Sequence, residues 1–274
     1  MNEFIYDLTS CGDAISSLSK LVGISKTDIE IFVHKNAYDY EYLSEKFIDQ
    51  FNVDVGSLDI SNLYFKIIQV TTNGDNCESI KKYGLLNTQE AIKEDTYISR
   101  YLKNKGISIN FDEESINFNS KTYCKSSEIN SDEVRLCFTK LFSKCHYPIN
   151  AFIYSDSPQN YGGGIKERPE LIGNLADSFE TNIEKDWIKN TKCFIVVFKV
   201  LVHNFHYSTF TDYEYEDEED KNDVIKKWLI KNSLELIHNL KLLNSGHRDI
   251  YAYLEPKYKV EPQNIVEFIE VNKE

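Results

Sequence analysis

The stretch at residues 65–87, FKIIQVTTNGDNCESIKKYGLLN, contains an apolar strand, a polar turn and a short helix in direct succession. Its β-branched and aromatic residues indicate the strand, and the turn-forming and helix-capping residues at 71–76 indicate the turn. We expect the helix to end at Gly84, because glycine is the usual residue after the last helical turn. This order places polar side chains at the end of a buried strand, where ligand-binding groups are often found.

Composition and charge limit the classes of function. The chain has 274 residues, of which 41% are hydrophobic, so it can bury the core of one larger domain or of one domain with an added segment. Its formal net charge of −13 disfavours nonspecific binding to DNA, RNA or an anionic membrane, although a local basic groove is compatible with it. No apolar run approaches the roughly 18 residues of a membrane span, and residues 1–13 lack the features of a signal peptide. We therefore expect a cytoplasmic protein with no membrane partner.

The cysteines suggest neither a metal site nor a disulfide framework. Six are spread along the chain, and none forms a Cys-x-x-Cys pair. Cys145 directly precedes His146, but neighbouring side chains on an extended segment point to opposite faces, which disfavours a Cys/His nucleophile. We expect no metal.

Helix signals in the first half of the chain lie on both sides of the strand within residues 65–87. Residues 1–58 show apolar residues at intervals of three and four and are expected to form a helical cap on a domain at residues 59–274. Residues 88–132 are polar and mixed, with helix signals at 89–104 and a turn-rich stretch at 115–131. Such an insertion often shapes a substrate entrance.

Strand signals resume in the second half. Strands are predicted at residues 133–139, 192–203, 250–254 and 265–271. The run 192–203 is the most apolar of the chain and is expected to be a central strand. The acidic residues 212–223 are expected to form a solvated loop, followed by an amphipathic helix at 224–243. Because no flexible linker interrupts the sequence, one α/β domain with the N-terminal helical cap is expected.

The segment at residues 65–87 resembles the opening motif of the ADP-ribosyltransferase-like fold, seen in DNA-targeting ADP-ribosyltransferase toxins, poly-ADP-ribose polymerases and tRNA 2′-phosphotransferases. In that family a strand with His-x-Thr, or a close variant, runs into a helix that ends in Ile-x-x-x-Gly-Leu. The matching residues are Thr71, Thr72, Ile80, Gly84 and Leu85. Gln69 stands where the family usually has His or Arg, and its amide can hydrogen-bond to a ribose hydroxyl. The alternative is an ordinary strand, turn and capped helix.

Residues 135–139, RLCFT, resemble the second motif of the same family, a strand end that lines the nicotinamide pocket. The resemblance implies that Phe138 stacks on the nicotinamide ring and that Thr139 bonds the carboxamide or a ribose. A similar Cys-Phe-Thr strand end occurs in some phage-defence abortive-infection proteins. The alternative is a core strand in which Phe138 only packs.

The C-terminal segment resembles the closing hairpin of the family, in which a strand with the catalytic glutamate precedes a Val-Pro-x-x-Asn-Ile-like turn. The residues that fit this turn are Val260, Pro262, Asn264 and Ile265. Residues 249, 251, 253 and 255 share one face of a regular strand, so the acids able to reach a pocket are Glu255, which we prefer, and Asp249. The alternative is that both are surface acids on an edge strand.

The three consecutive glycines at residues 162–164 allow positive φ and close approach of the backbone to another group. Exposed amides there could cradle a phosphate, with charge from Lys166 and Arg168, although the segment matches neither a Walker nor a Rossmann pattern. Tyr161 is a further candidate to stack on the nicotinamide ring. The alternative is a flexible loop that leads into a helix at residues 169–179.

The resemblance implies a mixed α/β (α+β) protein whose split, mostly antiparallel sheet surrounds a cleft for NAD. The implied activity is that of a glycosyltransferase that transfers ADP-ribose from NAD, consumed as a substrate, to a protein or nucleic acid. A bacterial toxin, with an antitoxin partner, or a phage-defence effector is the implied setting. The implied NAD-binding residues are Gln69, Thr71, Thr72, Phe138, Thr139 and Tyr161.

Two other functions stay open. One is a noncatalytic binding module on the same fold. The other is a nucleic-acid-modifying phosphotransferase or nuclease, for which His203 and His206 are candidates for acid–base chemistry.

Overall fold

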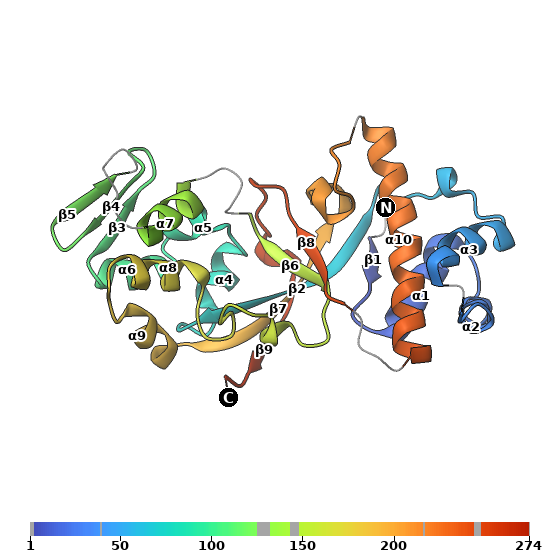
Figure 1. Cartoon of the computed structure of the whole chain (residues 1–274), viewed down its shortest axis with the longest axis horizontal. Helices are drawn as coiled ribbons and strands as arrows, with labels where there is room; N and C mark the ends of the chain where they lie inside the picture. The colour runs from blue at the N-terminus through green and yellow to red at the C-terminus, as the bar shows by residue number, and fades with distance from the viewer. Residues whose placement is uncertain are drawn as a thin grey trace. The chain divides into compact units, whose positions relative to one another are not determined.

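The computed structural model describes residues 3–38, 40–124, 132–142, 148–215, 217–243 and 248–273. Helices and a mostly antiparallel sheet make up this part of the chain, which confirms the predicted α/β (α+β) class (Figure 1). The chain forms two compact units. Unit 1 consists of Met1–Ile68, Ala151–Asp156 and Lys199–Tyr253, and unit 2 of Gln69–Asn150, Ser157–Phe198 and Leu254–Glu274.

The main sheet contains strands β1 (Phe4–Asp7), β2 (Leu63–Asn73), β6 (Asn150–Tyr154), β7 (Lys192–Leu201), β8 (Ile250–Tyr253) and β9 (Ile265–Val271). Their order is β8-β6-β2-β7-β9, and β1 pairs in parallel with β2 (Figure 1). Because β7 has neighbours on both sides, the prediction of a central strand in the apolar run at 192–203 is confirmed.

Both predicted C-terminal strands are present, but the expected hairpin is wrong. β8 pairs with β6, whereas β9 pairs antiparallel with β7. The segment between β8 and β9 is bound to residues that follow α4, because Val260 forms a backbone bridge to Leu85. Long-range pairing therefore overrides the local pairing that sequence proximity suggested.

Unit 1 contains the helices α1 (Cys11–Val22), α2 (Lys26–Lys35), α3 (Leu43–Phe51) and α10 (Glu218–His238), and the short helices η1 (Tyr40–Tyr42), η2 (Val55–Ser57), η4 (Val202–Asn204), η5 (Tyr207–Thr209) and η6 (Asn239–Leu243). Helices make up most of residues 1–58, as expected. The Ser10 and Ser25 side chains cap α1 and α2 by accepting from the third backbone N–H that follows each serine. Strand β1 is an addition to the prediction.

Helix α10 begins earlier than predicted, inside the acidic segment at residues 212–223. The Asp217 carboxylate caps the helix by accepting from the Asp220 backbone N–H at 2.8 Å. Glu218 and Glu219 lie in the first turn, where negative charge is favoured by the helix dipole. The acidic run therefore starts a helix instead of forming a loop throughout.

Unit 2 contains the helices α4 (Glu78–Tyr83), α5 (Thr88–Lys93), α6 (Tyr97–Asn104), α7 (Asp132–Phe142), α8 (Glu170–Ser178) and α9 (Ile183–Asn190), and the short helices η3 (Pro158–Asn160) and η7 (Pro262–Asn264). The predicted helix that ends at Gly84 is confirmed as α4. The helix signals at 89–104 correspond to α5 and α6, and the helix expected at 169–179 corresponds to α8.

The strand predicted at residues 133–139 is wrong, because this segment belongs to helix α7. Val134, Cys137, Phe138 and Leu141 are buried, which is the spacing of one helix face. The residue types at 133–139 fit a strand equally well, but Leu141 continues the helical spacing of apolar residues beyond residue 139. Packing of this face in the core of unit 2 decides the outcome.

A second, three-stranded antiparallel sheet contains β3 (Ile107–Asn110), β4 (Ser115–Phe118) and β5 (Lys121–Cys124). It occupies part of the stretch expected to be turn-rich, and residues 125–131 lie outside the described residues. Asn119 and Ser120 both have positive φ, as a tight two-residue hairpin turn requires. The polar residues therefore form one turn. The strands beside it are anchored by the side chain of Ile116, which is fully buried.

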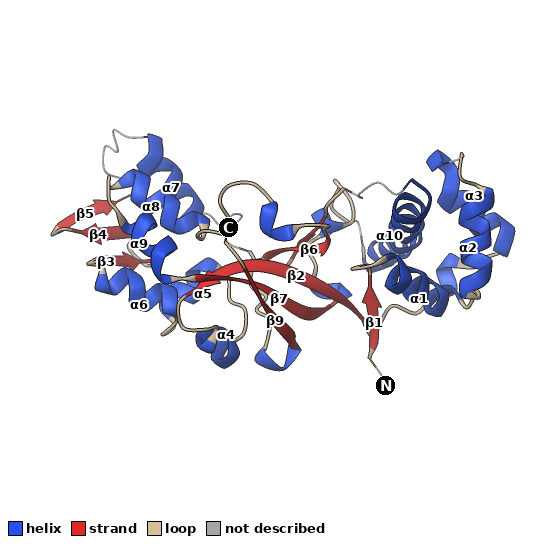
Figure 2. Ribbon diagram, turned by 90° about the horizontal axis from the view of Figure 1, so that it is seen from below, coloured by secondary structure: helices blue, strands red, loops and turns tan. Residues whose placement is uncertain are grey.

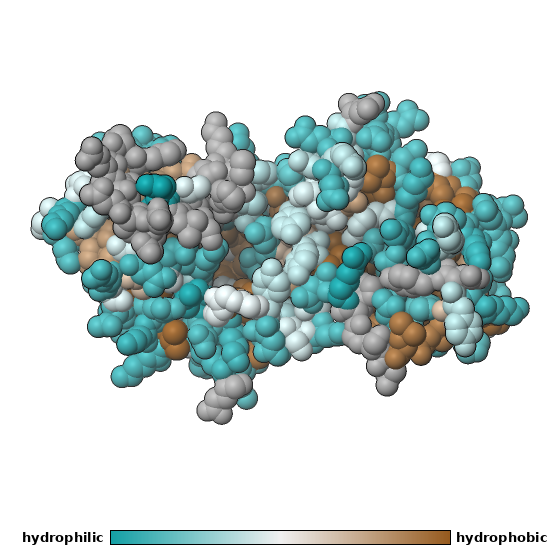
Figure 3. Space-filling model, in the orientation of Figure 1, coloured by the Kyte–Doolittle hydropathy of each residue, from teal (hydrophilic) through white to brown (hydrophobic). Residues whose placement is uncertain are grey.

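None of the helices in the described ranges is both long enough and apolar enough to cross a membrane. The face shown in Figure 3 is mainly hydrophilic, with small separate hydrophobic areas.

Candidate functional site

The predicted NAD-binding residues on strand β2 lie on two different faces of the strand. Val70 and Thr72 are buried, whereas Gln69 and Thr71 are only partly buried. The Thr72 hydroxyl accepts a hydrogen bond from the indole N–H of Trp187 at 2.8 Å, within the core of unit 2. Thr72 therefore anchors the strand to the core, and Gln69 and Thr71 remain as the side chains that can meet a ligand.

Gln69 bonds to the segment 149–150, which also bonds to the chain directly before Glu255. The Gln69 side-chain amide donates to the backbone carbonyl of Asn150 at 3.1 Å. The next carbonyl back along the chain, that of Ile149, accepts from the backbone N–H of Leu254 at 3.2 Å. Glu255 follows directly and is exposed. Gln69 and Leu254, the residue before the preferred catalytic acid, thus bond to adjacent carbonyls in unit 2.

A backbone bridge joins the predicted opening motif at residues 65–87 to the C-terminal segment. Leu85 and Val260 exchange two hydrogen bonds, of 3.0 Å and 2.9 Å, in an isolated antiparallel bridge. Nearby, the Asn87 side-chain amide donates to the Pro256 carbonyl at 3.3 Å. The end of the Gly84-Leu85 motif and the segment after Glu255 are therefore side by side.

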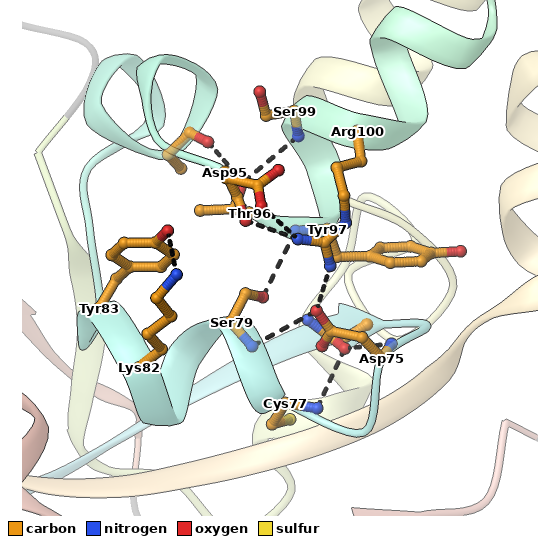
Figure 4. Close-up of polar contacts among 12 residues, drawn as sticks. Asp75, Cys77, Ser79, Lys82, Tyr83, Asp95, Thr96, Tyr97, Ser99 and Arg100 are labelled. Atoms are coloured by element: carbon orange, nitrogen blue, oxygen red, sulfur yellow. Dashed lines mark hydrogen bonds and ion pairs between the residues drawn. The ribbon is translucent and has the colours of Figure 1, made fainter.

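The turn after β2 is fixed by a polar cluster that Figure 4 shows. The Asn73 side-chain carbonyl accepts from the backbone N–H groups of Asp75, at 2.7 Å, and Cys77, at 3.0 Å. One Asp75 carboxylate oxygen accepts from the Arg100 guanidinium of α6 at 2.8 Å. Asp75 thus connects the turn to a helix that starts more than twenty residues later.

The same cluster is closely packed. A Cβ on Gly74 would lie 2.2 Å from the ring of Tyr97, so the end of the Tyr97 side chain would have to move for another residue type to fit. Arg100 also pairs with Asp95 at 3.6 Å, which leaves two carboxylates around one guanidinium. The second oxygen of Asp75 is buried and has no hydrogen-bond partner among the described residues. We conclude that this cluster holds the backbone beside Thr71 in place.

Cys77, which precedes α4, is not a nucleophile. Its side chain is fully buried. Burial, followed by the nearby Asp75 carboxylate, raises the pKa of the Cys77 thiol to about 12. Because the thiolate is the reactive form, this thiol stays inert near neutral pH.

The structure does not place Phe138 or Thr139 at a strand end, because both lie on α7. Phe138 is 1% exposed and packs against Phe142, with ring centroids 5.3 Å apart. Thr139 is exposed, and its hydroxyl donates to the carbonyl of Arg135 in the same helix at 2.9 Å. The predicted pocket positions of both residues rested on the strand at 133–139, which does not form.

Tyr161 and Asp249 lie in different units. Tyr161 follows η3 in unit 2 and is 48% exposed. Asp249 belongs to unit 1, directly before β8, and is partly buried. Only Glu255, of the two candidate acids, is in the unit that contains Gln69 and Thr71.

Two of the three glycines at residues 162–164 adopt the positive φ that the sequence allowed. Gly163 and Gly164 have φ of 69° and 71°. The Gly164 carbonyl accepts from the backbone N–H groups of Glu167 and Arg168, and the Arg168 guanidinium donates to Glu184 at 2.5 Å. Arg168 is therefore engaged in organising the loop before α8.

The two histidines of the acid–base alternative lie in unit 1. Burial, with a smaller effect from Lys221, lowers the pKa of the half-buried His203. The His206 ring caps η5 by accepting a hydrogen bond from the Ser208 backbone N–H at 3.4 Å, and its Nδ1 also contacts the Ser208 hydroxyl at 2.7 Å. Within the described ranges, no three His, Cys, Asp or Glu side chains are grouped so that they could hold a metal ion. Cys145 and His146 lie outside those ranges.

Sequence reasoning missed the roles of Asp75 and Arg100. The sequence indicated only that Asp75 lies in a turn, and no local pattern connects it to Arg100 on α6. No protein-family model, curated protein or solved structure matches this chain. The case for a function therefore rests on the arrangement of Gln69, Thr71 and Glu255 in unit 2.

Proposed function

We propose that this chain is a glycosyltransferase that transfers ADP-ribose from NAD to a macromolecule, either a protein or a nucleic acid. The observation that carries the proposal is that the Gln69 side chain donates to the Asn150 carbonyl, while the backbone N–H of Leu254, the residue before Glu255, donates to the adjacent Ile149 carbonyl. An amide and a carboxylate from distant parts of the sequence are thereby brought to one region. The Leu85–Val260 bridge supports the same arrangement.

The reaction breaks the bond between C1′ of the ribose and the nicotinamide nitrogen. The bonding electron pair leaves with nicotinamide, and the acceptor's nucleophile then bonds to C1′ and loses its proton. Positive charge develops on the ribose in the transition state, so a nearby carboxylate stabilises it. Glu255 is assigned this role. Gln69, through its side-chain carbonyl, and Thr71, through its hydroxyl, are assigned the ribose hydroxyls.

Burial of Phe138 leaves the stacking role on nicotinamide to another aromatic side chain. Tyr161 is proposed for it, because its ring is exposed and lies in the same unit as Glu255. We further propose that the protein acts in the cytoplasm as a toxin, held by an antitoxin, or as a phage-defence effector.

The direct test measures nicotinamide released from NAD by the purified chain, by mass spectrometry, together with the thermal shift caused by NAD. Glu255→Gln should lower turnover by about 100-fold or more with little change in NAD binding, because the carboxylate acts mainly in the transition state. Glu113→Gln is the matched control, since Glu113 is an exposed acid in a turn of the same unit. Labelled NAD added to a cell lysate then identifies the acceptor.

The second candidate is a noncatalytic binding module on the same fold. It is favoured by Gln69 in place of the family's usual His or Arg and by the burial of Phe138. NAD or ADP-ribose binding without nicotinamide release, in both the wild type and Glu255→Gln, would select this function. Absence of binding and of turnover would contradict both candidates.

A further inference from the structure

Strand β9 has an open edge. In the described sheet it is the last strand of the order, paired on one side with β7 (Figure 2). Two of its apolar side chains are exposed, Val266 at 58% and Ile269 at 42%. An edge strand with exposed apolar residues and unpaired backbone groups is a template for another strand, and proteins protect such an edge with charged side chains, especially lysine, or with proline. β9, with the sequence IVEFIEV, contains no lysine or proline, and its charged residues are Glu267 and Glu270.

One antiparallel register of two β9 strands places no glutamate directly opposite another glutamate. If two copies pair about Phe268, then Val266 faces Glu270 of the other copy and Glu267 faces Ile269 of the other copy. No glutamate then faces a glutamate, although like charges directly opposite each other would destabilise the pair. The two Phe268 rings meet at the centre, where an aromatic pair is favourable.

Neighbouring side chains fit this register. The Lys192 ammonium already pairs with Glu270 at 2.9 Å, so the charge that would face Val266 is neutralised within its own chain. The Lys81 ammonium, which pairs with Glu78 at 2.7 Å, lies 5.8 Å from the centre of the Phe268 ring. The Lys192–Glu270 pair lowers the cost of bringing two acidic strands together.

We propose that two copies of this chain associate through β9, edge to edge and antiparallel, with Phe268 on the two-fold axis. The occupant of the open edge is thus a second β9. Because each copy carries a net charge of −13, long-range repulsion opposes the association, and added salt should strengthen it.

Sedimentation over a wide concentration range tests the proposal. Ile269→Glu places a carboxylate opposite Glu267 of the other copy and should weaken the dimer, whereas Ile269→Lys places an ammonium there and should strengthen it. Since each substitution occurs twice in a symmetric dimer, the dissociation constants should move by roughly 2- to 30-fold in opposite directions. The double variant Glu267→Lys, Ile269→Glu should restore association.

Ile31→Glu and Ile31→Lys are matched controls, because Ile31 is an exposed isoleucine outside β9, on α2. They should change the dissociation constant little, and circular dichroism should confirm that all variants are folded. A chain that stays monomeric at every concentration and salt level would overturn the proposal. Equal effects of Ile269→Glu and Ile269→Lys would also overturn it, since the register requires the sign of the charge to matter.

Discussion

The α-carbon of Gly84 lies so close to Val260 that an added Cβ would sit 1.8 Å from the Val260 carbonyl oxygen. Gly84 also has φ of 80°, which side-chain-bearing residues rarely adopt. Both features follow from the backbone bridge between Leu85 and Val260. The glycine that ends α4 therefore serves two purposes: it terminates the helix, and it lets the C-terminal segment approach.

Gly84→Ala should destabilise the protein by about 2–5 kcal/mol, because the methyl group clashes with backbone that cannot turn away. Gly106→Ala is the control, since Gly106 also has positive φ, of 70°, but has no atom within 4 Å of the added Cβ. That variant should lose only about 1–2 kcal/mol from strain. Urea unfolding compares the two, and equal losses would show that the approach of Val260 costs nothing extra.

Thr72→Val should lower the free energy of unfolding by about 1–3 kcal/mol, because the buried N–H of Trp187 loses its acceptor. Thr71→Val removes a hydroxyl from the half-buried face and should change stability much less. Under the proposed function, NAD affinity should respond in the opposite order, falling for Thr71→Val and not for Thr72→Val. Chemical unfolding and an NAD titration on both variants separate the two roles.

Arg100→Met should destabilise unit 2 by about 1–2 kcal/mol, because it leaves the mostly buried Asp75 carboxylate without its cation. The value is lower than for a fully buried pair, since the Arg100 side chain is 41% exposed. The double variant Arg100→Met, Asp75→Asn should recover part of the loss. A double-mutant cycle measures the coupling, and a coupling near zero would mean that the contact in Figure 4 does not hold the turn.

Cys77 should make the protein less stable in strongly alkaline solution. Its folded pKa, about 12, is above the ordinary thiol value of 9.0, so the folded state keeps the proton over this range while the unfolded state loses it. This contribution is complete below pH 9.0 and is lost as the pH rises toward about 12. Cys77→Ala should therefore show a smaller fall in unfolding free energy above pH 9.0 than the wild type. The difference between the two pH profiles isolates Cys77 from tyrosines that titrate in the same range.

Thiol alkylation gives an independent check of Cys77. In the native state its reaction should be slow at neutral pH and should speed up only when the protein unfolds. Rapid modification of native Cys77, identified by mass spectrometry, would contradict both the burial and the raised pKa.

Local patterns were sufficient for several elements that surround the candidate site. The apolar strand β2, the capped helix α4 and the apolar strand β7 could all be predicted, because their periodicity and their end signals lie within a few residues. Helix α10 was predicted for the same reason, except for its acidic first turns. The run of three glycines allowed positive φ, and Gly163 and Gly164 adopt it.

Other features depend on residues that meet only in the folded chain. The residue types at 133–139 fit a strand or a helix, and burial of Phe138 and Leu141 in the core of unit 2 selects the helix. No local signal pairs Asp75 with Arg100 or brings Glu255 beside the segment bonded to Gln69. Periodicity and capping arise from short-range backbone geometry and are therefore written in consecutive residues. The partners of a polar side chain are chosen by long-range packing, so only the tertiary structure identifies them.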